Sequence, residues 1–168
     1  MNWKWKTPKG FTLIELLIVV AIIGIISAIA VPNLLLAIQR SKARRTMADI
    51  RSLAMAWEAR NSDVGRYNAA GGVDGIDVAV SADDVDTGLM PTYMQRRPLV
   101  DAWGHDLAFF TDSAFGSAAG AKRYAIVSGG HDGVITPEIL SGPFTNYDCD
   151  IVYASGSFLS YPEGFGLK

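Results

Sequence analysis

The feature that most constrains this chain is a long apolar run near its N-terminus, with one acidic residue at its start. From Leu16 to Ile38 there are 23 residues without a charged side chain. As a helix rising about 1.5 Å per residue, this run reaches roughly 34 Å, enough to cross a hydrocarbon core of about 30 Å. Glu15 stands at the beginning of the run. Because a carboxylate in hydrocarbon costs about 3 kcal/mol on insertion scales, Glu15 indicates a functional site with a cationic partner.

The segment that precedes Phe11 differs in order from a secretory signal peptide. Its sequence, MNWKWKTPKG, is lysine-rich and ends in Gly10. A secretory signal has its apolar core before its small-residue cleavage site, whereas here the small-residue break comes first. Cleavage between Gly10 and Phe11 keeps the apolar run in the mature chain and creates an α-amino group near Glu15. That amine, on the same chain or on a neighbouring chain displaced along the helix axis, is the expected cationic partner.

The string KGFTLIELLIVVAIIGIISAIAVP resembles the N-terminal segment of the type IV pilin superfamily, which includes type IV pilins, the pseudopilins of type II secretion and competence pseudopili. The matching residues are Lys9, Gly10, Phe11, Glu15 and Pro32. The resemblance implies that a prepilin peptidase cuts after Gly10 and methylates Phe11 to N-methylphenylalanine. It also implies that Glu15 recruits the next subunit by pairing with the Phe11 amine of a neighbour. The alternative is an uncleaved single-pass anchor in which Glu15 is incidental.

Beyond the apolar run, the sequence predicts an amphipathic continuation of the same helix. Apolar residues recur at three- and four-residue spacing, at Ala43, Met47, Ile50, Ala54 and Trp57. The residues from 61 to 65 are typical of a helix end.

Pro32 lies inside this long helix and is expected to break it. Proline removes a backbone donor and crowds the preceding turn, so a kink or a locally melted stretch is predicted at residues 28–32. In the family that the chain resembles, this proline lets the helix loosen as it leaves the bilayer. The alternative is a simple kink without functional consequence.

Charge is modest overall but unevenly placed. The net charge of −2 provides no global basic field, and nucleic acid is therefore not an expected partner. A cationic cluster follows the apolar run, at Arg40, Lys42, Arg44 and Arg45. A solvated, lipid-facing helix end is the preferred interpretation of this cluster, with a DNA contact as the alternative. Lysines on the other side of the run leave the positive-inside rule undecided. The resemblance instead implies that the N-terminus is cytoplasmic and that the chain beyond about residue 40 is periplasmic.

The C-terminal part of the chain predicts an antiparallel sheet. Short runs of aromatic and β-branched residues bounded by glycine and aspartate occur at Leu107–Thr111, Arg123–Ser128, Asp150–Ala154 and Ser157–Tyr161. The first two and the last two are expected to form hairpins, and the apolar face of the sheet to bury the helix stripe. Residues 61–100 are read as irregular, with strand-like alternation at Ile76–Val80 and a short helix or turn after it.

The predicted fold class is therefore α+β and pilin-like: a long N-terminal helix, half transmembrane and half amphipathic, packed on a small antiparallel sheet. The expected divisions are a cleaved leader, a transmembrane assembly helix, its amphipathic continuation and a globular head, at residues 1–10, 11–39, 40–61 and 62–168.

Two further strings narrow the resemblance to the major pseudopilins of type II secretion. PLVDAWGHDLAFF resembles their segment that contains a proline, an aspartate and a Trp-Gly pair, with alanine replacing the second proline, and YAIVSGGHDG resembles a segment that ends in Asp-Gly. The matching residues are Pro98, Asp101, Trp103, Gly104, Tyr124, Ser128, Gly130, Asp132 and Gly133.

The second string carries a metal prediction. Major pseudopilins hold a calcium ion in the following loop, which implies Asp132 and Asp150 as ligands here, with Asp148 as a third. Calcium takes about six to eight oxygen ligands and suits a loop that supplies carboxylates from both ends. The chain departs from the family in that VITPEILSGPFTNYDC is long and lacks a glycine-rich middle. The alternative is that the three aspartates are solvated turn residues.

The cysteine and histidine residues argue against a disulfide-closed C-terminal loop and against an active site. Cys149 is the single cysteine, so the intrachain disulfide that closes the C-terminal loop of many type IV pilins cannot form. His105 and His131 each stand beside an aspartate, but neighbouring residues on a strand face opposite ways. We therefore expect no active site.

The sequence predicts a structural subunit of a helical filament rooted in the inner membrane. The preferred version is the major pseudopilin of a type II secretion system, acting in protein export. The alternative is a type IV pilin of a surface fibre used for adhesion, motility or DNA uptake. A monomeric anchored binding module or enzyme is the competing class. The implied partners are further copies of the chain, minor pilins or pseudopilins, prepilin peptidase, an inner-membrane platform, a cytoplasmic assembly ATPase and membrane lipid.

Overall fold

The chain divides into two compact units, Met1–Gln39 and Arg40–Lys168, here called the anchor unit and the head unit. The computed structural model describes residues 10–64, 78–111, 123–136, 141–154 and 156–163. The boundary between the units coincides with the end of the apolar run.

Helix α1 spans Leu13–Val64 and keeps Pro32 inside it. The helix is uninterrupted at the proline, so the locally melted stretch predicted at residues 28–32 is not observed in the single chain. Beside the proline, the Asn33 side-chain Nδ2 donates to the Ile29 carbonyl at 3.0 Å. This bond supports the turn that the proline ring crowds. Loosening of the helix inside a filament stays a prediction.

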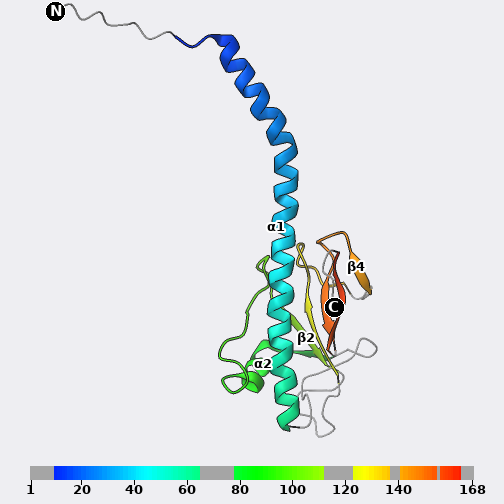
Figure 1. The fold of residues 1–168 in the computed structure, drawn as a ribbon. Helices are drawn as coiled ribbons and strands as arrows, with labels where there is room; N and C mark the ends of the chain where they lie inside the picture. Colours follow the sequence, from blue (N-terminus) through cyan, green and yellow to red (C-terminus); the bar gives the residue numbers. More distant parts are fainter. Residues whose placement is uncertain (1–9, 65–77, 112–122, 137–140, 155, 164–168) are drawn as a thin grey trace, which may run out of the picture. The chain divides into compact units, whose positions relative to one another are not determined.

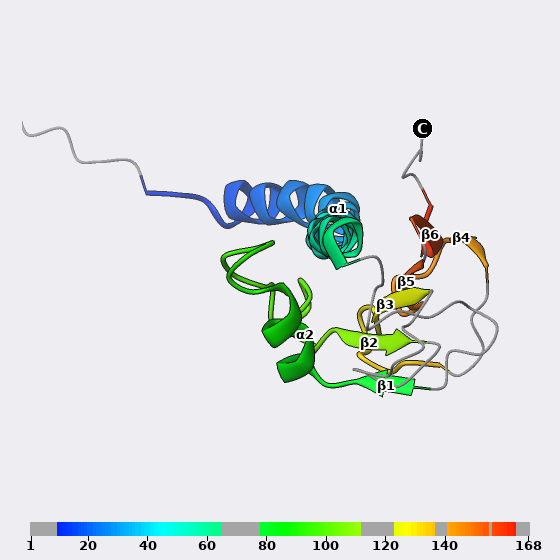
Figure 2. The same ribbon diagram turned by 90° about the horizontal axis from the view of Figure 1, so that it is seen from below.

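The head unit carries a six-stranded sheet in the order β1-β2-β3-β5-β6-β4 (Figures 1 and 2). The strands are β1 (Val78–Val80), β2 (Ala108–Thr111), β3 (Tyr124–Ser128), β4 (Gly142–Phe144), β5 (Ile151–Ala154) and β6 (Ser157–Pro162). Neighbouring strands pair antiparallel except β4 and β6, which are parallel. Helix α2 (Ala82–Leu89) follows β1.

The predicted strands are confirmed, each to within one or two residues. β2 and β3 pair antiparallel, as the predicted hairpin requires, although the loop between them lies outside the described residues. β5 and β6 do the same. One element corrects the sequence interpretation, because β4 was not predicted. Helix α2, directly after β1, confirms the short helix or turn expected after Ile76–Val80. α2 begins at an N-cap where the Ser81 hydroxyl accepts from the Asp84 amide at 3.1 Å.

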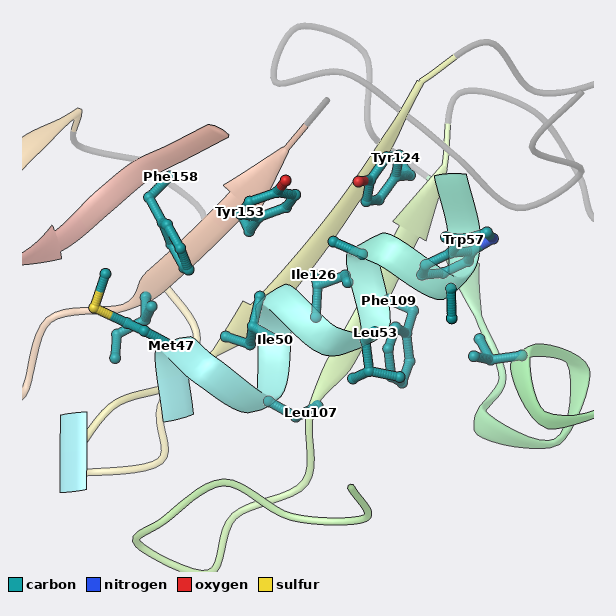
Figure 3. Close-up of a cluster of buried hydrophobic side chains, with 14 of the residues drawn as sticks. Met47, Ile50, Leu53, Trp57, Leu107, Phe109, Tyr124, Ile126, Tyr153 and Phe158 are labelled. Carbon is teal, nitrogen blue, oxygen red and sulfur yellow. The ribbon is translucent and has the colours of Figure 1, made fainter. Parts of the chain in front are cut away.

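The predicted apolar stripe forms the helical side of the core. Its members are at most 6% exposed, and they are Ala43, Met47, Ile50, Ala54 and Trp57. Figure 3 shows Met47, Ile50 and Trp57 facing the aromatic and aliphatic residues of the sheet. The Trp57 ring lies 5.7 Å from that of Phe109 and 5.3 Å from that of Tyr124. The α+β class is thus confirmed.

Candidate functional site: the helix start and the braced loops

The predicted processing and assembly residues lie at the start of α1, on an exposed surface. Gly10 is exposed and the Phe11 side chain is 80% exposed. Glu15 lies in the first turn of the helix. The structure therefore places the predicted cleavage point just ahead of the helix, at exposed residues outside it.

Glu15 has a partner that the sequence interpretation missed. Its Oε2 accepts from the Thr12 amide at 2.8 Å and from the Thr12 hydroxyl at 2.7 Å. In return, the Glu15 amide donates to the Thr12 hydroxyl at 3.3 Å. This reciprocal pair is a capping box, whose Thr-x-x-Glu signature is readable at residues 12–15. Glu15 thus satisfies a free amide at the helix start, in addition to any role between subunits.

The two pseudopilin-like strings meet each other in the head unit at a buried aspartate. Asp101 is 4% exposed, and its Oδ1 accepts at 2.9 Å from the amides of Trp103, Gly104 and His105. Its Oδ2 accepts from the Ser128 hydroxyl at 2.7 Å. We call this arrangement the Asp101 brace. It closes the turn after Asp101 and fastens that turn to the end of β3.

The contacts of the Asp101 brace account for these motif residues, so no catalytic role is needed to explain them. Ser128 donates to Asp101, while the His105 Nδ1 lies 3.9 Å from the Asp101 Oδ2, beyond hydrogen-bond distance. The His105 Nδ1 lies instead 3.1 Å from the Gly130 carbonyl oxygen. Since the Ser128 hydroxyl donates to a carboxylate and the His105 Nδ1 lies against a backbone carbonyl, these contacts do not pair the two residues as nucleophile and base. They position the turn after β3.

That turn is packed so closely that glycine is required in it. Gly130 has φ +63°, and a Cβ there would lie 2.6 Å from the Cys149 carbonyl oxygen. A Cβ on Gly133, at φ +72°, would lie 2.7 Å from the His105 ring. Of the three glycines in the second string, the two that match the family, Gly130 and Gly133, are therefore explained by close approach.

The three predicted calcium ligands are not gathered into one set. The Asp132 Oδ1 accepts from the Val134 amide at 3.0 Å, and the Asp148 Oδ1 lies 2.8 Å from the His131 Nδ1. Among the described residues there is no group of three His, Cys, Asp or Glu side chains placed to hold a metal ion. The described loops therefore do not bring the three carboxylates together in the predicted arrangement.

Asp150 is the exception, because one of its oxygens is unsatisfied. Its Oδ2 accepts from the Thr136 amide at 2.8 Å and from the Thr136 hydroxyl at 2.7 Å. Its Oδ1 is buried and has no hydrogen-bond partner among the described residues. A buried orphan carboxylate oxygen is costly unless something binds it, so Asp150 fits a cation ligand.

Cys149, next to Asp150, is half-buried. Burial, followed by the neighbouring carboxylates, raises the pKa of the Cys149 thiol. Because the thiolate is the reactive form, this residue is a small packed side chain rather than a nucleophile.

The fold and these sites together describe a membrane-anchored structural subunit. The N-terminal helix is long and apolar enough to cross a membrane by length and composition. In the head unit, the polar side chains of the Asp101 brace hold a turn, and the Ser81 hydroxyl caps a helix.

Comparison with known proteins agrees with this class. The prokaryotic N-terminal methylation motif matches residues 5–31. The type II secretion system core protein G of Klebsiella michiganensis is 28% identical over 133 residues, covering 77% of this chain and 87% of that protein. The type IV major pilin protein PilA of Myxococcus xanthus is 47% identical over 60 residues, covering 36% of this chain but 27% of that pilin. The type IV major fimbrial protein FimA of Dichelobacter nodosus is 54% identical over 50 residues, covering 30% of this chain and 32% of that protein. No solved structure gave a significant match.

The N-terminal methylation motif and the similarity to type IV pilins and to a type II secretion core protein support assignment to the type IV pilin superfamily. It is a pilin-like filament subunit and not an enzyme.

Proposed function

We propose that this chain is the major pseudopilin of a type II secretion system, whose filament acts in protein export. The main support for this proposal is the share of the chain that aligns with a type II secretion protein. The similarity to core protein G extends over 77% of this chain, and therefore includes head residues, whereas the fimbrial and pilin relatives cover 30% and 36%. The Asp101 brace supports the same version, because it joins the two strings that resemble major pseudopilins.

A type IV pilin of a surface fibre, used in adhesion, motility or DNA uptake, is the second candidate. It is favoured by local identity, which reaches 47% with PilA and 54% with FimA, against 28% with core protein G. Deleting the gene and assaying the culture medium for secreted enzymes separates the versions. Loss of secretion without loss of surface fibres supports the pseudopilin, and the opposite result supports the pilin.

In both versions, assembly begins with processing. Prepilin peptidase would cut after Gly10 and methylate Phe11, with the N-terminus in the cytoplasm and the head in the periplasm. A cytoplasmic ATPase, an inner-membrane platform and minor subunits would then add the chain to the filament. Intact-mass measurement of the membrane-extracted protein tests this step. Loss of the first ten residues with gain of one methyl group supports it, and a full-length mass contradicts it.

The step that joins subunits uses Glu15. Both Thr12 donors bond to the Glu15 Oε2, and within the described part of the chain no hydrogen bond to the other carboxylate oxygen is found. We infer that the cap orients the carboxylate while its charge attracts the Phe11 amine of an incoming neighbour. The ion pair relieves the exposure of both charges to lipid.

Two variants separate the cap from the charge. Glu15→Gln keeps a side-chain oxygen able to accept from Thr12 but removes the negative charge, and Thr12→Ala removes the cap but keeps the charge. We expect filament formation to be lost in Glu15→Gln and retained in Thr12→Ala. The assay is filament yield in sheared cell fractions, with membrane level of the subunit as the control. The opposite pattern would assign the role of Glu15 to helix capping alone.

We also propose that Asp150 is a calcium ligand, supported by its buried, unpartnered Oδ1. A calcium ion bound there would neutralise this carboxylate and tie down the loop between β3 and β5. Asp132 and Asp148 remain candidate ligands from sequence resemblance, each with another partner in the single chain.

Thermal unfolding of the full chain in detergent tests this proposal. With calcium, the melting temperature of the parent protein is expected to rise above that with chelator, because the ion binds the folded state. Asp150→Ala should abolish the difference. Asp106→Ala, at an exposed position, is the matched control and should retain it. A parent protein indifferent to calcium contradicts the proposal without affecting the filament function.

A further inference from the structure

We propose that the head unit contains a redox-active tyrosine, Tyr124, which receives an electron hole from Trp57 and passes its phenolic proton to Glu58. The electron hole is the positive charge left on a ring when one electron is removed. The substrate of this site is a diffusible one-electron radical oxidant, which is reduced to its anion. This activity goes beyond the proposed role in secretion and does not depend on it.

The core of the head unit holds a series of aromatic rings in near contact. The ring centroids of Trp57 and Tyr124 lie 5.3 Å apart, and those of Tyr124 and Tyr153 lie 6.1 Å apart. Figure 3 shows these rings following one another across the core. Trp57 and Tyr124 are at most 1% exposed. Because electron transfer becomes faster as rings approach one another, a hole on Trp57 can reach Tyr124 directly through the protein interior.

A carboxylate beside Tyr124 is placed to take its proton. The Tyr124 hydroxyl donates to the Glu58 Oε1 at 3.0 Å. Burial, followed by nearby Tyr153 and Glu58, raises the pKa of the Tyr124 hydroxyl, so the folded head keeps this phenol protonated. An oxidised phenol is a strong acid and releases its proton to a base within hydrogen-bond distance. Glu58 therefore makes Tyr124 easier to oxidise, and the hole settles on this ring.

The oxidation consists of two electron transfers and one proton transfer. The radical oxidant takes one electron from the Trp57 indole and leaves as its anion. The indole radical cation then takes one electron from the Tyr124 phenol. The O–H bond of Tyr124 breaks as an O–H bond to the Glu58 Oε1 forms. The products are a restored indole, a neutral phenoxyl radical and a protonated carboxyl group.

The two ends of the ring series resist the hole. Phenylalanine rings close the series: Phe109 lies 5.7 Å beyond the indole, and Phe158 lies 4.9 Å beyond Tyr153. The guanidinium carbon of Arg97 lies 5.6 Å from the Phe109 centroid, and that of Arg51 lies 5.5 Å from the Phe158 centroid. A phenyl ring is harder to oxidise than indole or phenol, and a nearby cation further disfavours positive charge on it. The hole is therefore confined to the indole and the phenols between these ends.

The test uses the full-length protein in detergent, with azidyl radicals made by pulse radiolysis as the oxidant. Azidyl radicals oxidise indole rings and become azide. We expect loss of the indole radical absorption and growth of the phenoxyl absorption in one shared phase. The rate of this phase should be independent of protein concentration, because the transfer occurs within one chain. A phase that is absent, or that quickens with protein concentration, overturns the proposal.

Matched substitutions identify the two rings. Tyr124→Phe keeps the ring but removes the phenol, and Trp57→Phe removes the indole, so each should abolish the phase. The controls are Tyr161→Phe and Trp103→Phe, at a half-buried tyrosine and a half-buried tryptophan, and both should retain it. Should Trp57→Phe fail to fold, the Tyr124→Phe result decides. A phase retained in Tyr124→Phe assigns the radical to another tyrosine and overturns the proposal.

A third substitution tests the proton acceptor. Glu58→Gln keeps an oxygen able to accept from Tyr124 but removes the carboxylate that takes the proton. We expect the phase to slow by about tenfold or more. In the parent protein, the phase should also slow in deuterated buffer, because the transferred proton is then a deuteron. Rates unchanged by Glu58→Gln and by deuteration would overturn the proton transfer to Glu58.

Discussion

Apolar side chains of the same kinds are exposed in the anchor unit and buried in the head unit. In the anchor unit, Leu13 is 88% exposed and Ile14 is 66% exposed. In the head unit, Ile50 and Ile126 are fully buried. The head finds partners for its apolar residues within its own chain, whereas the anchor must find them in lipid or in other subunits. The head is therefore the part whose apolar packing a mutation can disturb in a single chain.

The largest test of this difference is a core truncation. Trp57→Ala removes a ring that is 1% exposed and packs between Phe109 and Tyr124. We expect it to lower the free energy of unfolding of the head by about 3–5 kcal/mol, measured by denaturant titration in detergent. Leu17→Ala, at an anchor position 64% exposed, is the control and should leave that free energy unchanged. Similar losses of unfolding free energy in both variants would contradict the difference between the two units.

The Asp101 brace gives the next largest effect. Asp101→Ala removes a buried acceptor shared by three backbone amides and the Ser128 hydroxyl. Leaving such donors unsatisfied should destabilise the head by about 2–3 kcal/mol. The same titration measures it, and Asp106→Ala, at an exposed neighbour, should cost less than about 0.5 kcal/mol. Equal effects of the two substitutions would mean that the brace contributes nothing beyond a surface charge.

Tyr124 makes head stability sensitive to alkaline pH. Burial, followed by nearby Tyr153 and Glu58, raises the pKa of the Tyr124 hydroxyl far above its usual value. The unfolded chain releases this proton near pH 10 while the folded chain keeps it, so stability is full below that pH and falls above it. The expected slope is about 1.4 kcal/mol per pH unit. Tyr124→Phe should flatten the slope relative to the parent protein, and unaltered slopes in melts between neutral and alkaline pH would contradict this reasoning.

The smallest expected effect lies in the anchor. Thr12→Ala removes the cap shared with Glu15 and should weaken the first helical turn by about 1 kcal/mol. Hydrogen exchange of the amides at residues 13–16, measured in detergent micelles, should quicken, while exchange in the sheet stays unchanged. Thr12→Ser keeps a hydroxyl and should preserve the protection. Protection retained in Thr12→Ala would show that the anchor helix start needs no local cap.

Sequence patterns predicted the elements that carry a local signal. The runs that became β2, β3, β5 and β6 are aromatic or β-branched between turn residues, and the stripe from Met47 to Trp57 has a helical period. β4 has no such signal, because Gly142 and Pro143 are poor strand formers. Its pairing with β6 is a parallel contact set by tertiary packing.

The sites, like the strands, divide into those with a local sequence signal and those without one. The N-terminal motif predicts Gly10 and Phe11 as processing residues and Glu15 as an assembly residue from their order along the chain, and these roles stay predictions. The Thr12 cap was readable from its four-residue signature. The Asp101 brace was not predictable from spacing, because Asp101 and Ser128 lie 27 positions apart. The calcium prediction placed three carboxylates by resemblance, whereas hydrogen bonds to Val134 and His131 engage two of them elsewhere.

The ends of the sheet have a consequence for a protein that must accumulate at high density. The order of strands leaves β1 and β4 at the two edges, and each is three residues long. β4 also carries Pro143, which has no amide hydrogen to offer a neighbouring strand. Short edges of this kind are poor templates for a further strand from another copy. Crowded subunits are thus guarded against pairing sheet to sheet into an irreversible aggregate.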